Sequence, residues 1–103
     1  MTGQIAFRPA ALDDLLNLFD YIADEASAAV AGSYIDRIEQ FCRSLTTFPE
    51  RGARRDDLAP GLRTVGFERR ATIAFRVSGG EVQIVRIFYG GQDFDAALRD
   101  DGR

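Results

Sequence analysis

Arginine is the main side chain in this sequence that could bind or transform a charged ligand, because it supplies every basic group. All 13 basic residues are Arg, and none is Lys. Eight of them fall within residues 51–92 beside four acidic residues, which gives this segment a charge of +4 in a chain of net charge −3. Guanidinium groups bind carboxylates and phosphates in a planar, bidentate manner. The clustering favours an arginine-rich concavity on or beside a sheet, although ordinary solvated strand positions account for it equally well.

The commonest side chain for proton transfer is absent. The sequence has no His, which is the commonest acid–base group and metal ligand and a member of every Ser or Cys triad. Arg stays protonated at ordinary pH, and Tyr89 would need a strongly lowered pKa to act as a base. Cys42 is the only cysteine, which excludes an intrachain disulfide and a thiolate metal cluster. We expect no metal and no cofactor, and we interpret Cys42 as a small core residue.

Two helices are predicted before these arginines. Residues 4–7 resemble a short strand, and Pro9 opens a helix that runs to about residue 24. A second helix spans about 28–47, with Ser27 as its cap. Its apolar stripe consists of Ala31, Tyr34, Ile35, Ile38, Phe41, Cys42, Leu45 and Phe48. The few residues between the helices require them to lie side by side and antiparallel.

Three strands are predicted to follow a loop over residues 49–61. They cover 62–67, 70–77 and 82–89, joined by tight turns at Glu68-Arg69 and Gly79-Gly80. Residues 93–98 would form one or two helical turns, and 99–103 a frayed tail. The chain is thus expected to be one domain over 1–103, of the α+β class. Its order is β-α-α-β-β-β plus a short C-terminal helix, with the helical hairpin packed on an antiparallel sheet.

Both faces of the last strand are mostly apolar. Simple alternation places Ile84, Arg86 and Phe88 on one face with Val82, and Val85, Ile87 and Tyr89 on the other. A two-layer domain needs only one apolar face, so the second face must be covered. Two segments could cover it. One is the C-terminal turn with Phe94 and Leu98, and the other is a partner chain.

Arg86 lies in the middle of this apolar strand. A buried charge without a partner costs several kcal/mol, so Arg86 needs a carboxylate, a phosphate or a route to water. Asp93 is the nearby internal candidate, and an acid on a partner is the alternative.

Composition narrows the function class. The pI of about 4.8 argues against binding nucleic acid through bulk charge. No apolar run reaches about 18 residues, and no secretion signal is visible at the start. We therefore expect a soluble cytoplasmic domain without a membrane partner.

Several segments in order along the chain resemble the RelE/ParE superfamily of toxins from type II toxin–antitoxin modules, and the resemblance covers about residues 5–95. Residues 7–15 resemble the start of the family's first helix, and 45–52 the exit of its second helix. The most specific segments are Arg54-Arg55-Asp56-Asp57-Leu58-Ala59-Pro60-Gly61-Leu62-Arg63 and Val85-Arg86-Ile87-Phe88-Tyr89-Gly90-Gly91-Gln92-Asp93. These positions are more similar to the ParE branch, whose modules are associated with plasmid stabilisation, than to the RelE branch.

The resemblance implies two activities. ParE-like toxins poison DNA gyrase by protein–protein binding, and this is the function we expect. RelE-like toxins cut messenger RNA on the ribosome, which would here assign catalytic roles to Arg63, Arg86 and Tyr89. The sequence lacks the Lys and His of that pattern. A non-toxic binding module of the same fold is the third possibility.

The resemblance also implies an antitoxin as partner. It would be a ParD-like ribbon-helix-helix protein that alone contacts operator DNA and wraps the toxin with a flexible arm. An arm that folds on binding needs exposed apolar surface and charged anchors. The expected interface residues are Arg63, Arg70, Arg76, Val82, Ile84, Arg86 and Phe88.

Overall fold

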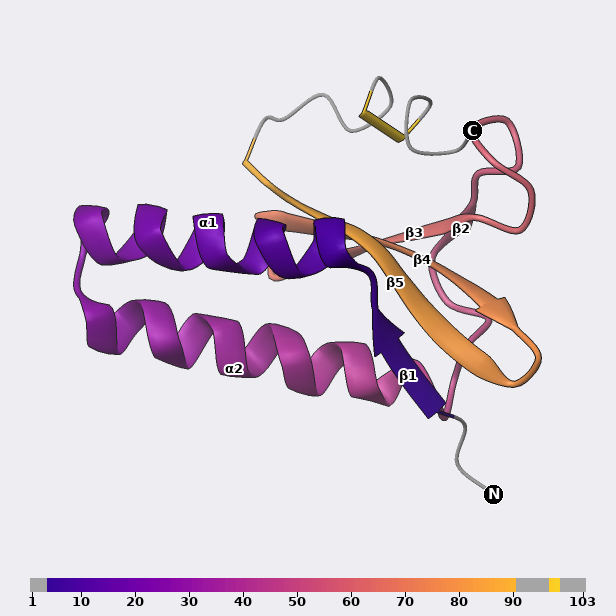
Figure 1. Cartoon of the computed structure of the whole chain (residues 1–103), viewed down its shortest axis with the longest axis horizontal. Coiled ribbons are helices and arrows are strands. Elements are labelled where there is room, and N and C mark those ends of the chain that lie inside the picture. The colour runs from indigo at the N-terminus through magenta and orange to yellow at the C-terminus, as the bar shows by residue number, and fades with distance from the viewer. Residues whose placement is uncertain (1–3, 91–96, 99–103) are drawn as a thin grey trace.

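A computed structural model describes residues 4–90 and 97–98, in which a helical hairpin packs against one face of a five-stranded sheet (Figure 1). The elements are β1 (Gln4–Phe7), α1 (Pro9–Glu25), α2 (Ala28–Ser44), β2 (Ala53–Arg54), β3 (Arg63–Phe67), β4 (Ala71–Ser78) and β5 (Glu81–Tyr89). The strand order across the sheet is β1-β5-β4-β3-β2. The α+β class is confirmed. No helix in this part of the chain is long and apolar enough to cross a membrane.

The sheet is mixed, and the expectation of a purely antiparallel sheet is wrong. β1 pairs in parallel with β5, from Gln4 opposite Glu81 to Phe7 opposite Ile84. The chain between β1 and β5, which includes the helical hairpin and β2 to β4, is long enough for the crossover that parallel pairing requires. β2 is a further strand inside the predicted loop, where Ala53 pairs with Thr64. Two residues are too few to show a strand period, so the sequence could not reveal it.

The helix starts lie where the sequence places them. Pro9 is the first residue of α1, and the Ser27 hydroxyl accepts a hydrogen bond of 3.1 Å from the Val30 amide at the start of α2. α2 ends at Ser44, three residues before the expected end. Phe48 therefore leaves the helical stripe and is 65% exposed, not buried as expected.

The main core lies between the hairpin and the sheet. Ile38 and Cys42 of α2 are fully buried there, together with Ile73 and Phe75 of β4. Ile73 and Phe75 therefore share the helix-facing side of β4. The interpretation of Cys42 as a core residue is also confirmed, and burial raises the pKa of its thiol to about 12.

A β-bulge in β5 changes which side chains share a face. Ala74 lies opposite Arg86, but Phe75 lies opposite Ile84, so Val85 has no direct partner in β4. Beyond this bulge, Ile87 joins the core beneath the helices and Phe88 points to the other side. The predicted alternation is therefore wrong after Val85, because a bulge depends on strand pairing and not on local composition.

The second face of the sheet is covered by the chain itself. Phe88 and Val85 pack there in a smaller core that includes Leu98 and residues 58, 59 and 62 of the segment before β3. The proposed internal cover is confirmed for Leu98, while Phe94 lies outside the described residues. Phe88 is only 3% exposed, and Val82 and Ile84 are buried beneath the hairpin. The expectation that these three residues form an open apolar surface is therefore wrong.

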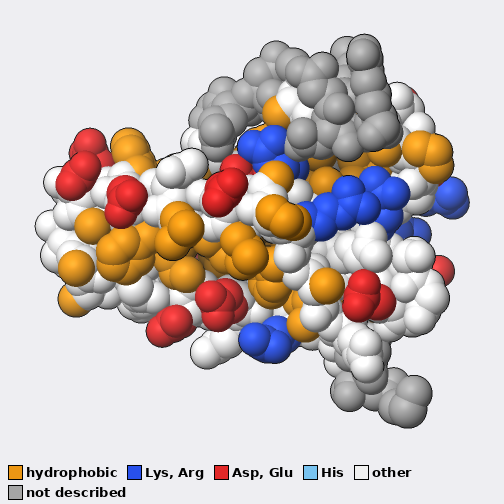
Figure 2. Space-filling view, viewed as in Figure 1, with side chains coloured by type: hydrophobic (Ala, Val, Ile, Leu, Met, Phe, Trp, Pro, Cys, Tyr) orange, Lys and Arg blue, Asp and Glu red, His pale blue; other side chains and the backbone are white. Residues whose placement is uncertain are grey.

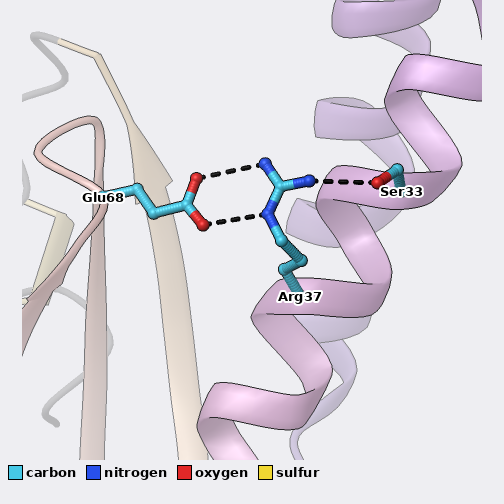
Figure 3. A network of polar contacts seen from close by, with 3 residues as sticks. All are labelled: Ser33, Arg37 and Glu68. Atoms are coloured by element: carbon cyan, nitrogen blue, oxygen red, sulfur yellow. Dashed lines mark hydrogen bonds and ion pairs between the residues drawn. The ribbon is translucent and has the colours of Figure 1, made fainter.

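The turn between β3 and β4 is tied to α2. Glu68 and Arg69 both have positive φ angles, 49° and 63°, in a turn without glycine. Arg37 of α2 donates hydrogen bonds of 2.9 and 3.1 Å to the Glu68 carboxylate and one of 3.0 Å to the Ser33 hydroxyl (Figure 3). These hydrogen bonds lower the pKa of Glu68. The network holds the turn in this conformation against the helix.

Candidate functional site

The structure separates the four arginines expected at the antitoxin interface. Arg86 lies opposite Ala74 and Arg76 lies two residues further along β4, so both belong to the second face. Arg63 lies opposite Phe75 and therefore belongs to the helix-facing side. Arg70 lies in the turn that precedes β4. Only Arg76 and Arg86 share a face.

Arg86 is held by an acid of the same chain. Its Nε and Nη2 atoms lie 2.8 and 3.0 Å from the two carboxylate oxygens of Asp14 on α1. The two side chains are only 21% and 13% exposed. The guanidinium also lies 5.0 Å from the ring centre of Phe88. The expectation of a carboxylate partner is confirmed, but the acid shown is Asp14; Asp93 lies outside the described residues.

Asp14 also completes the hydrogen bonding of β5. β1 pairs with β5 only as far as Ile84, and α1 lies beside the rest of that strand. The Asp14 carboxylate accepts a hydrogen bond of 2.8 Å from the Ile87 amide at this position. One carboxylate thus replaces a neighbouring strand and neutralises a strand arginine.

A second cationic group lies next to Arg86 on this face. Gln83 lies opposite Arg76, and its side-chain oxygen accepts a long hydrogen bond of 3.4 Å from Arg8. The Nε atom of Arg76 is buried and has no hydrogen-bond partner among the described residues. We call Arg8, Arg76 and Arg86 the basic patch. Figure 2 shows basic side chains gathered over the strands, beyond the end of the hairpin.

The outer side of α1 carries an exposed apolar stripe. Leu12 and Leu16 are 48% and 66% exposed, and the partly buried Phe19 and Ala23 continue the same helical stripe. We call these four residues the hairpin band. Figure 2 shows hydrophobic side chains in a band along the hairpin with acidic side chains on both sides. The band is therefore apolar and bordered by negative charge.

The acids beside the hairpin band are free to meet a partner. Asp13, Asp20 and Asp24 form the adjacent stripe of α1, and all three are exposed. No ion pair within the described residues involves any of them. A partner that covers the band would therefore meet uncompensated carboxylates.

A cleft of about 500 Å³ lies between the end of β5 and the side of α1 that carries Asn17 and Tyr21. Its lining residues are Asp14, Asn17, Leu18, Tyr21, Arg70, Ile87, Tyr89 and Gly90. Tyr89 packs edge-on against Tyr34 at 5.8 Å and lies 5.9 Å from Tyr21. Tyr89 belongs to the helix-facing side of β5, because it packs against the main core. The suggested nuclease trio of Arg63, Arg86 and Tyr89 is thus not gathered on one face.

Comparisons with known proteins agree with the geometry. The model of the ParE toxin of the type II toxin–antitoxin system parDE matches residues 5–94. The chain belongs to the ParE toxin family. Toxin ParE3 of Caulobacter vibrioides is 34% identical over 85 residues, which cover 82% of this chain and 84% of that protein. The ParE match also agrees with the branch that the sequence segments favour.

Two solved structures resemble the fold of this chain. The chromosomal ParDE system of P. aeruginosa contains a chain with 28% identity and a TM-score of 0.75, covering 86% of this chain and 97% of that one. The RelBE2 toxin–antitoxin complex of Mycobacterium tuberculosis shares the fold, with 17% identity and a TM-score of 0.61 over 86% of this chain and 99% of the other. The RelE/ParE-like fold is confirmed.

Proposed function

We propose that this ParE-family toxin acts by binding DNA gyrase rather than by cutting RNA. The observation that carries the proposal is the use of Arg86, the central cation of the nuclease alternative, in a structural pair with Asp14. The chain also has no His and no Lys that could complete an acid–base pair. Gyrase as the target rests on the family resemblance. Because gyrase is a cytoplasmic enzyme, we also place the toxin in the cytoplasm.

Purified toxin should then inhibit gyrase supercoiling and leave linear, cleaved plasmid. In a parallel assay on programmed ribosomes, the message should stay intact. The variant Tyr89→Phe distinguishes the nuclease alternative, because its loss of RNA cleavage would assign Tyr89 to catalysis. Arg86→Ala also breaks the structural pair with Asp14, so its loss of cleavage counts only if its circular dichroism spectrum shows a folded protein. Intact supercoiling at micromolar toxin together with arrested translation would overturn the gyrase proposal. Unimpaired growth of cells that express the toxin without its antitoxin would instead identify a non-toxic binding module.

We also propose that a ParD-like antitoxin neutralises the toxin and alone contacts operator DNA. The P. aeruginosa relative belongs to a ParDE system, and the mycobacterial relative is a toxin–antitoxin complex. The basic patch offers charge-assisted hydrogen bonds to carboxylates of an arm, while Arg63 and Arg70 lie apart from it as separate candidate anchors. The proposed interface does not include Val82, Ile84 and Phe88, because the chain itself buries these side chains.

The hairpin band supplies the apolar part of this proposed interface. It fits an amphipathic helix of the antitoxin with apolar side chains three and four residues apart. The neighbouring Asp13, Asp20 and Asp24 favour Lys or Arg at the flank of that helix. The proposed antitoxin therefore brings acidic anchors to the sheet and basic residues to the hairpin.

A further inference from the structure

We propose that the cleft between α1 and β5 binds a small planar aromatic ligand that carries an oxyanion and has about the size of a nucleoside monophosphate. Its volume of about 500 Å³ is in the usual range for small-molecule sites. Asn17 and Tyr21 lie on a different side of α1 from the hairpin band. Ile87 and Tyr89 lie on the opposite side of β5 from the second face. The cleft therefore lies apart from the hairpin band and from the second face, and it shares only Arg70 with the candidate antitoxin anchors.

Tyr21 supplies an aromatic wall. Its side chain is 53% exposed, so one part of the ring is open to a ligand. The Tyr21 ring is supported by Tyr89, 5.9 Å away, which in turn packs edge-on against the buried ring of Tyr34. A fixed and partly exposed ring is a platform on which a planar group can stack. The wall therefore selects flat aromatic ligands.

Arg70 supplies the positive charge. Its side chain makes no ion pair or hydrogen bond within the described residues, although it lines the cleft. Its backbone is fixed, because its amide donates to the Phe67 carbonyl at 3.2 Å and its carbonyl accepts from the Gly90 amide at 2.8 Å. From this fixed backbone position, the guanidinium can reach a ligand in the cleft and bind two oxygens of a phosphate or carboxylate.

The negative charge in the cleft is already compensated. Both Asp14 oxygens accept from Arg86, and one also accepts from the Ile87 amide. Asp14 therefore opposes an anionic ligand far less than an isolated carboxylate would. The cleft retains a net attraction for an anion through Arg70.

A buried donor without a partner lies behind the aromatic wall. The Tyr34 hydroxyl has no hydrogen-bond partner among the described residues. Burial raises its pKa to about 12, so it stays protonated, and it is close enough to Arg70 and Tyr89 for their charges to act on it. Tyr34 does not line the cleft, so it supports the aromatic wall from behind and makes no ligand contact. The preference for an acceptor-rich ligand rests on Arg70.

Titration of the isotope-labelled toxin followed by NMR tests the site with four probes. AMP carries both ring and oxyanion, adenosine only the ring, inorganic phosphate only the oxyanion, and benzoate a ring with a carboxylate. We expect AMP to shift the amide signals of Tyr21, Gly90 and Ile87, with adenosine and phosphate at least about tenfold weaker. If benzoate binds more tightly than AMP, the site still takes an aromatic ring with an oxyanion, and the natural oxyanion is then a carboxylate rather than a phosphate. Equal affinity for AMP and inorganic phosphate would overturn the proposal, as would no shift at millimolar AMP.

Matched variants locate the ligand. Arg70→Ala should weaken AMP binding by about 10- to 100-fold, the usual effect of losing a hydrogen bond to a charged group. Tyr21→Ala should weaken it by about fivefold or more, while Tyr21→Phe keeps the ring and should keep most of the affinity. Arg69→Ala is the control, because this neighbouring arginine does not line the cleft. Equal losses in Arg69→Ala and Arg70→Ala would show non-specific charge attraction and contradict the site. Amide spectra without ligand verify that each variant is folded.

Discussion

Arg86 shows how a single charged residue in an apolar strand determines its surroundings. Its pair with Asp14 is largely shielded from water, with side chains 21% and 13% exposed. Removal of one partner from such a pair leaves an uncompensated charge in a poorly solvated place. The pair therefore acts in the fold, whatever the toxin binds.

Asp14→Ala should lower the free energy of unfolding by about 3 kcal/mol, because it removes the carboxylate that pairs with Arg86 and the acceptor of the Ile87 amide. Urea unfolding followed by circular dichroism measures the change. The double variant Asp14→Ala with Arg86→Ala should lose less than the sum of the single changes. Asp13→Ala is the control, since this adjacent acid is exposed, and it should change stability by less than about 0.5 kcal/mol. A similar loss in both aspartate variants would contradict the structural role of the pair.

The need for a partner could be predicted from the sequence, but the identity of the partner could not. An arginine within an apolar run requires an acid on physical grounds alone. Asp14 is 72 residues away along the chain and meets Arg86 only because α1 lies beside β5. Nothing in the local pattern of either residue shows this contact.

At the scale of elements, the helices were more predictable than the sheet. Pro9 and Ser27 mark helix starts through local chemistry, and the structure confirms both. The parallel pairing of β1 and the bulge at Val85 depend on which strands are neighbours. Period-two alternation contains no information on either, so residues after the bulge were assigned to the wrong faces.

The proposed role of α1 in antitoxin binding leads to a prediction for Leu16. Its side chain is 66% exposed at the centre of the hairpin band, so Leu16→Asp should leave the fold intact. Loss of a buried leucine contact and addition of a charge should weaken the antitoxin complex by about 10- to 100-fold, since burial of such a side chain contributes about 1.5–3 kcal/mol. Calorimetric titration with the antitoxin measures this effect.

Val77→Asp provides the matched control for Leu16→Asp. Val77 is also exposed, at 44%, but it lies near the end of β4 rather than on the hairpin band. Its variant should bind the antitoxin with nearly unchanged affinity. Equal weakening by both substitutions would place the contact elsewhere.

For the whole molecule, the two buried groups with raised pKa values predict sensitivity to alkaline pH. The Cys42 thiol ionises near pH 12 in the folded chain and near pH 9 when exposed, and Tyr34 near 12 against 10. The unfolded state therefore loses these protons first, and stability falls as the pH rises from about 9 to 12. Below pH 9 neither group makes the free energy of unfolding depend on pH.

Cys42→Ala should reduce the fall in the free energy of unfolding between pH 9 and 12. The smaller side chain also lowers the stability at pH 7. Each group with a proton retained only in the folded state contributes up to about 1.4 kcal/mol per pH unit. Urea unfolding at pH 7, 9, 10 and 11 gives the slope for each protein. An identical slope in the variant would show that Cys42 ionises as easily in the folded chain as in the unfolded one.

The overall class and the family were accessible from sequence, whereas the surface available to partners was not. Apolar residues on both faces of β5 indicate correctly that both faces need a cover. They do not show that residues 58–62 fold back over the second face, because that segment has no strand or helix period. An exposed apolar surface lies instead on α1, at Leu12 and Leu16.

The carboxylate at the margin of β5 has a consequence for self-association. An unpaired strand margin attracts extended segments from other molecules and can seed aggregation. Here the Ile87 amide already donates to Asp14, so a foreign strand finds that donor occupied. Exchange of Asp14 for an apolar residue would release this one donor, and concentrated solutions of such a variant would associate more readily than those of the parent chain.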